Sequence, residues 1–328
     1  MDRSVMQSFH YNSPEEIGPL ELSLPDACAG LRLDQALVRL FPELSRARWQ
    51  ALIEAGKVRL DGAEARSKSK VWGGESLWLE NEPEPFSEEV LPQNLPLDTV
   101  TLDPSFRVVN KPAGLVVHPG HGNREGTLQN ALLFHDPLLQ GVPRSGLVHR
   151  LDKETSGLMV VARTLAAHGD LVRQLQARTV HRHYWALVQG RMLAGGVVEA
   201  PIGRHPTQRT RMAVVSSGRH AVTHYDVVQN LPCHTLVECR LETGRTHQIR
   251  VHLQHLGFPL AADPVYGGRE AVLDEDSLRA LKNFGRQALH AFHLGFMHPV
   301  THQPCAWDIP MADDMVQLMK VLAHASFI

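Results

Sequence analysis

An acidic, proline-rich segment divides this sequence and limits how the chain can fold. Residues 81–98 read NEPEPFSEEVLPQNLPLD and contain four prolines. Because proline fixes φ and lacks a backbone donor, the segment suits an extended linker better than the interior of a helix or sheet. The 328 residues are enough for two domains at roughly 150 residues each. We therefore expect 81–98 to be a linker, with a small domain before it and a larger one, 99–328, after it.

The composition is that of an ordinary globular protein, with 43% hydrophobic and 21% charged residues. The four cysteines form no CxxC pair, which argues against a zinc ribbon and a disulfide framework. No apolar run approaches the roughly 18 residues that span a bilayer. Residues 1–29 are polar and lack the apolar core of a signal peptide. We expect a cytoplasmic protein in which 1–29 is a polar N-terminal extension.

Local charge differs from the overall charge of the chain, which is −2. Residues 31–72 contain nine basic and five acidic side chains, a balance of +4. Ser45 predicts the N-cap of a helix, and Arg46 and Arg48 fall in its first turn, where the helix dipole disfavours cations. Free backbone N–H groups and two guanidinium groups would suit a phosphate, such as that of RNA. A solvated basic face is the alternative.

The segment RLDQALVRLFPELSRARWQALIEAGKVRLDG, residues 32–62, resembles the S4-like RNA-binding domain of ribosomal and RNA-modifying proteins. The resemblance covers about residues 30–80. It implies a small α/β domain that binds RNA at this end of the chain.

The segment HRLDKETSG, residues 149–157, lies between the apolar runs 146–148 and 158–162. This pattern predicts a loop between two strands, a common position for catalytic groups. Asp152 is its candidate catalytic residue. Taken alone, an aspartate in a loop is as well explained by hydrogen bonds that stabilise a turn.

The larger domain has the pattern of an α+β fold. Strands are predicted around 107–110, 184–188 and 235–241, and helices over 128–134, after Thr164 and after Gly244. Along the second of these strands, alternate side chains should face opposite sides of the sheet. No regular βαβ repeat occurs, which favours a largely antiparallel, mixed sheet.

Three motifs in this domain belong together: His149–Asp152 (HRLD), Arg182–Tyr184 (RHY) and Gly244–Arg250 (GRTHQIR). They closely resemble motifs of the pseudouridine synthases of the RluA/RluD family, and the RluD subgroup, which has an S4-like domain in front, is most similar. The match also includes KPAGLVVHPG at 111–120 and DPVYGG at 263–268. The resemblance implies isomerisation of uridines in large-subunit (23S) ribosomal RNA without a cofactor.

The same resemblance implies roles for individual residues. Asp152 is the expected nucleophile, and Arg245 the arginine that pairs with it. Arg150 is expected to enter the RNA where the target base is flipped out. Tyr184 would pack on the uracil and is a candidate for removing the proton on carbon 5, while Ile249 would form part of the apolar floor.

Other functions stay open from sequence alone. The chain could be a non-catalytic RNA-binding or ribosome-assembly factor, or could act on transfer RNA. The expected partner is large-subunit ribosomal RNA or an assembling large subunit, and nothing demands more than a monomer. His247, His252 and His255 lack metal-ligand spacing, so no metal site is expected. His149 and His247 are instead expected to be hydrogen-bond donors that orient the loops.

Overall fold

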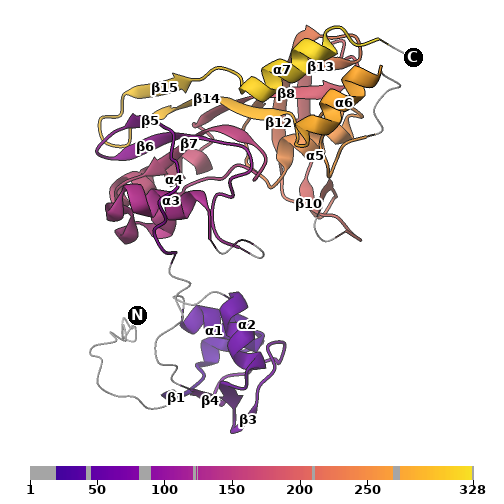
Figure 1. Ribbon diagram of the computed structural model, residues 1–328. Coiled ribbons are helices and arrows are strands. Elements are labelled where there is room, and N and C mark those ends of the chain that lie inside the picture. Colours follow the sequence, from indigo (N-terminus) through magenta and orange to yellow (C-terminus); the bar gives the residue numbers. More distant parts are fainter. Residues whose placement is uncertain are drawn as a thin grey trace. The chain divides into compact units, whose positions relative to one another are not determined.

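The computed structural model describes residues 20–41, 46–80, 90–120, 123, 125–208, 211–268 and 274–326. Contacts divide the chain into two compact units, 1–89 and 90–328 (Figure 1). The division falls within the segment expected to be a linker. Its second half packs on the second unit, because the Gln93 N–H donates to the carbonyl of Asn130 at 3.0 Å, and Asn130 Nδ2 donates to Leu91 at 2.7 Å.

The first unit packs two helices on a small antiparallel sheet. Its strands are β1 (Leu20–Ser23), β2 (Val58–Leu60), β3 (Ala63–Glu64) and β4 (Ser76–Leu79), in the order β1-β4-β2-β3. The helices are α1 (Leu33–Leu40) and α2 (Arg46–Glu54). Leu33, Leu37 and Ile53 pack with Val58 and Leu77 in one core. Residues 20–23, which were expected in a polar extension, thus supply a strand of this sheet.

The second unit is built on a nine-stranded sheet in the order β5-β6-β7-β14-β8-β13-β12-β9, with β15 paired to β14. Only the β7–β14 pair is parallel in this sheet, so the expected mixed, largely antiparallel α+β fold is confirmed. The strands are β5 (Thr99–Leu102), β6 (Phe106–Lys111), β7 (Ser156–Ala162), β8 (His181–Gln189), β9 (Gly196–Glu199), β12 (Val222–Asn230), β13 (His234–Leu241), β14 (Leu289–Met297) and β15 (Pro304–Asp308). A separate hairpin joins β10 (Ile202–Arg204) to β11 (Met212–Val214).

Helices cover both faces of this sheet (Figure 1). They are α3 (Leu128–His135), α4 (Leu165–Gln176), α5 (Gln248–His255), α6 (Glu275–Phe284) and α7 (Asp313–Leu322). Side chains of α3 and α5 share a core with Tyr184, Ala186 and Val188 of β8. Leu187 points to the other face and packs with α6 and α7, while α4 packs on β6 and β7. The predicted alternation along 184–188 is therefore confirmed.

The segment before the HRLD motif does not form the expected strand. A 3-10 turn, Pro143–Gly146, runs up to residue 146, and Leu147 makes only an isolated bridge to Val161. Gly146 has φ +79°, and a Cβ there would lie 1.9 Å from the carbonyl oxygen of Ala162. The backbone at Gly146 lies directly against β7, and the motif is a loop that follows a turn and leads into β7.

Candidate active site

A cavity of about 570 Å³ opens in the second unit at the HRLD loop. Its walls come from that loop, from β8, from the turn after β13 and from the first turn of α5. Five arginines and a single carboxylate line it: Arg144, Arg150, Arg182, Arg245, Arg250 and Asp152. A cavity with this excess of positive charge suits a polyanion such as RNA.

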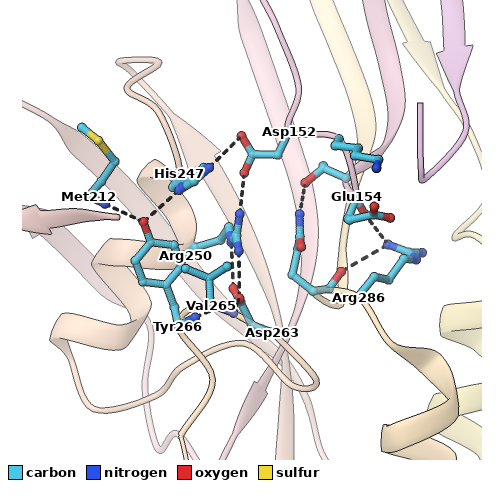
Figure 2. A network of polar contacts seen from close by, with 12 residues as sticks. Asp152, Glu154, Met212, His247, Arg250, Asp263, Val265, Tyr266 and Arg286 are labelled. Carbon is cyan, nitrogen blue, oxygen red and sulfur yellow. Dashed lines mark hydrogen bonds and ion pairs between the residues drawn. The ribbon is translucent and has the colours of Figure 1, made fainter. Parts of the chain in front are cut away.

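Two cationic side chains hold the loop that carries Asp152 through hydrogen bonds to backbone carbonyls. The Lys111 ammonium group, which is fully buried, donates to the carbonyls of Pro112, Leu115 and Lys153 at 2.7, 2.9 and 2.9 Å. Arg286 Nη1 donates to the carbonyl of Glu154 at 3.1 Å, as the right side of Figure 2 shows. Burial lowers the pKa of Lys111 to about 7, and the carboxylates of Glu154 and Asp152 oppose that shift. The loop is thus fixed from two sides.

Asp152 lies at one end of a row of alternating charges (Figure 2). Its Oδ2 accepts a hydrogen bond from Arg250 Nη1 at 3.2 Å. Asp263 holds the other edge of the same guanidinium group, with Nε–Oδ2 2.7 Å and Nη2–Oδ1 2.8 Å. Burial works against a charged Arg250, but the two carboxylates raise its pKa. Arg250 is therefore a fixed cation beside Asp152.

The structure thus gives Asp152 a different partner from the one expected. Arg245 lines the same cavity, but its Nε donates to the carbonyl of His220 at 3.0 Å. Among the ion pairs of the described residues, none joins Arg245 to Asp152. Both arginines belong to the motif GRTHQIR. Arg245 precedes α5 and Arg250 lies in its first turn, so only Arg250 is directed at Asp152. Arg250 and Asp263 are the residues that the sequence reasoning missed, and both belong to motifs it had identified.

His247 faces the second oxygen of Asp152, with its Nε2 3.9 Å from Oδ1. Its Nδ1 lies 2.8 Å from the hydroxyl of Tyr266, which also accepts the N–H of Met212 at 2.8 Å. Since that hydroxyl has one proton, the arrangement favours donation to Nδ1 and leaves the proton of a neutral His247 on Nε2. Burial, helped by the charge of Arg250, lowers the pKa of His247, while Asp152 opposes this.

The other expected site residues also line the cavity. Tyr184, only 5% exposed, lies on the cavity side of β8, and burial raises its pKa. Arg150 lies in the HRLD loop, and Ile249 in the first turn of α5. The Nε2 of His149 accepts the N–H of Val160 at 3.1 Å, which leaves the proton of the neutral ring on Nδ1, and burial lowers the pKa of His149 to about 3.

Arg46 in the first unit has a structural partner that the sequence reasoning did not foresee. Asp34 is fully buried, and it accepts hydrogen bonds from Arg32, Arg46 and Gln50. Arg46 therefore compensates a buried carboxylate, although its side chain is 46% exposed. The side chain of Arg48 lies outside the described part of the chain.

No group of three or more His, Cys, Asp or Glu side chains among the described residues could hold a metal ion. None of the helices described is long and apolar enough to cross a membrane.

Comparisons with known proteins agree with this geometry. The family model for RNA pseudouridylate synthase matches residues 105–255, and that for the S4 domain matches 31–75. A protein of Nitrosomonas europaea called ribosomal large subunit pseudouridine synthase D is 52% identical over 312 residues, which cover 95% of this chain and 90% of that protein. A protein of the same name from Xanthomonas campestris pv. campestris is 50% identical, with 96% and 97% covered.

Solved structures give the same result at lower identity. Human RNA pseudouridylate synthase domain containing 4 is 26% identical with a TM-score of 0.55, covering 70% of this chain and 94% of that one. The chain belongs to the RNA pseudouridylate synthase family, and it is an isomerase that makes pseudouridine in RNA. Within that family it is similar over nearly its whole length to the proteins named ribosomal large subunit pseudouridine synthase D, and in this chain an S4 domain precedes the catalytic part.

Proposed function

We propose that this protein converts specific uridines of large-subunit ribosomal RNA to pseudouridine, with Asp152 as the nucleophile. The names of the relatives that match nearly the full length support the choice of RNA. The observation that carries the mechanism is the single carboxylate in an arginine-lined cavity, held by Arg250 through one oxygen. Arg250 holds the Asp152 carboxylate by a charged hydrogen bond, and the carboxylate is the group that attacks.

The proposed reaction neither gains nor loses atoms. Asp152 attacks the nucleotide through Oδ1, since Oδ2 is bound by Arg250. Oδ1 bonds to C1′ of ribose as the bond from C1′ to N1 of uracil breaks, the base turns, and C5 then bonds to C1′ as the bond between C1′ and Oδ1 breaks. The C5 proton leaves and N1 gains one, so the product is an isomer and the chemistry requires no cofactor.

Neighbouring residues have separate proposed roles. The target base must leave its stack, at a cost of a few kcal/mol, and the planar guanidinium of Arg150 would occupy the vacated position. The ring of Tyr184 and the side chain of Ile249 would contact the uracil, and the Tyr184 oxygen, as a phenolate, would take the C5 proton. Arg245 lines the cavity without binding Asp152, so we propose that it contacts the RNA.

The test is tritium release from RNA labelled at C5 of uridine. Large-subunit ribosomal RNA and transfer RNA, both transcribed in vitro, would be incubated with the purified protein and with Asp152→Asn. We expect release from the ribosomal RNA only, and none above background with Asp152→Asn. Asp276→Asn, which changes an exposed aspartate (75%) on α6, is the matched control and should keep wild-type activity.

Either of two results would contradict the proposal. Full activity of Asp152→Asn would show that Asp152 is not the nucleophile. Tritium release from transfer RNA alone would show that transfer RNA is the substrate, and the proposed chemistry would still hold.

A further inference from the structure

Arg182 is a buried cation without a counter-ion. It is 7% exposed, and its Nε is fully buried without a hydrogen-bond partner. Among the described residues no carboxylate forms an ion pair with it. The other buried arginines of this unit have a carboxylate partner, since Arg250 binds Asp152 and Asp263, and Arg286 binds Asp314. Arg107, whose Nε also lacks a hydrogen bond, lies 3.8 Å from Asp136. An unpaired buried charge is costly, so such a group points to a partner that the protein alone does not supply.

The position of Arg182 shows where that partner would bind. Arg182 lies two residues before Tyr184 on β8, so both side chains face the same side of the sheet, and both line the cavity. The HRLD loop, which carries Asp152, lines the same cavity as Arg182. A partner of Arg182 would therefore lie within the cavity, near the proposed nucleophile.

The turn after β13 leaves room for this guanidinium group. A Cβ added to Gly244 would lie 2.9 Å from Arg182 Nη1. The structure gives no positive φ for Gly244, so close approach explains the glycine better than backbone conformation does. Glycine at 244 thus permits Arg182 to lie against the turn that leads to Arg245 and α5.

We propose that Arg182 binds a phosphate group of the RNA backbone at the target nucleotide. A phosphate carries the full negative charge that a buried guanidinium needs, and it matches the planar fork of donors. The carbonyl groups of uracil are neutral and would leave the charge uncompensated. This inference rests on the proposed function, because it assumes that RNA enters the cavity.

The test compares stability with RNA binding for Arg182→Met, which keeps an unbranched side chain and removes the charge. Binding to in vitro transcribed large-subunit ribosomal RNA would be measured in full-length protein with Asp152→Asn in every sample, so that no turnover occurs. We expect the dissociation constant to rise about 10- to 100-fold. The slope of log K against log salt should fall by about 0.7–0.9, the value of one phosphate contact.

Thermal unfolding separates a binding role from a structural one. Since Arg182 is unpaired in the free protein, Arg182→Met should leave the melting temperature unchanged or raise it. Arg182→Lys, which keeps the charge, should retain most of the salt slope. The control Arg279→Met changes an exposed arginine on α6, which does not line the cavity, and should leave affinity and slope unchanged.

A second variant tests the same contact from the other side. Gly244→Ala should weaken binding by displacing the guanidinium, and adding it to Arg182→Met should have little further effect. A lower melting temperature with unchanged affinity and salt slope in Arg182→Met would overturn the inference. That result would not affect the proposed chemistry. Conversely, turnover by Asp152→Asn would show that Asp152 is not the nucleophile and would not bear on the contact between Arg182 and phosphate.

Discussion

Tyr184 combines two properties that make different demands on one side chain. Its ring is buried in the cavity wall, where it can pack against a base, and its hydroxyl has a pKa raised by burial. At neutral pH the phenol therefore keeps its proton in the free protein. Deprotonation becomes harder but yields a stronger base, as removal of a proton from carbon requires.

Tyr184→Phe separates the ring from the hydroxyl. We expect RNA affinity to stay at the wild-type value while single-turnover tritium release falls about 10²- to 10⁴-fold. The wild-type rate should rise with pH from about 7 to about 9, because the phenolate fraction grows below a raised pKa. Tyr225→Phe, outside the cavity lining, is the control. A rate within a few fold of wild type for Tyr184→Phe would limit this residue to ring contact.

The choice between two arginines marks the limit of the sequence at this scale. Both Arg245 and Arg250 are in one motif, and the resemblance favoured the first. Which one reaches Asp152 depends on where α5 begins and on which face of its first turn meets the HRLD loop. Those are properties of packing between segments about a hundred residues apart. Asp34 is a similar case, because nothing in the spacing shows that it binds Arg46.

At the scale of the element, the sequence predicted helices better than it predicted which strands pair. Local patterns predicted α3, α4 and α5, and Thr164 accepts the N–H of Ala167 at 3.1 Å as an N-cap should. The parallel contact of β7 with β14 joins Gly157 to Ala291, and no local pattern indicates it. Gly157, with φ +116°, leaves no room for a side chain, since a Cβ would lie 2.1 Å from the carbonyl of Ala291.

The HRLD loop depends on Lys111, which lies at the end of β6. Lys111→Met would remove a donor from three partly buried carbonyls, of which that of Lys153 keeps the N–H of Gly114, and each buried group left unsatisfied costs about 1–3 kcal/mol. We expect the free energy of unfolding of the second unit to fall by about 2–5 kcal/mol in urea titrations. Lys320→Met on the exposed side of α7 should change it by less than about 0.5 kcal/mol. Equal stability of the two variants would show that the three contacts contribute nothing.

At the scale of the whole molecule, charge is distributed unevenly between regions. The chain carries −2 overall, while residues 31–72 carry +4 and the cavity presents five arginines against one carboxylate. Exposed cations in the first unit include Arg66, Lys68 and Lys70, next to Trp72, which is 66% exposed. These residues are better placed to bind RNA backbone than Arg46, whose charge is already shared with Asp34.

The double variant Lys68→Ala/Lys70→Ala should therefore weaken binding of ribosomal RNA and reduce the salt slope by about 1.4–1.8, the value of two phosphate contacts. The melting temperature should not change, because both side chains are exposed. Lys282→Ala and Lys320→Ala together, which alter two exposed lysines of the second unit, keep the change in net charge equal. If this control reduces the slope as much, the effect is one of net charge and not of the S4 domain.

The most direct test of the central claim is a map of pseudouridines in large-subunit ribosomal RNA from cells whose only copy of this protein carries Asp152→Asn. The account predicts that specific uridines, modified in cells with the wild-type protein, stay unmodified, and that Asp276→Asn restores all of them. An unchanged map, with the Asp152→Asn protein present at its normal level, would contradict Asp152 as the nucleophile.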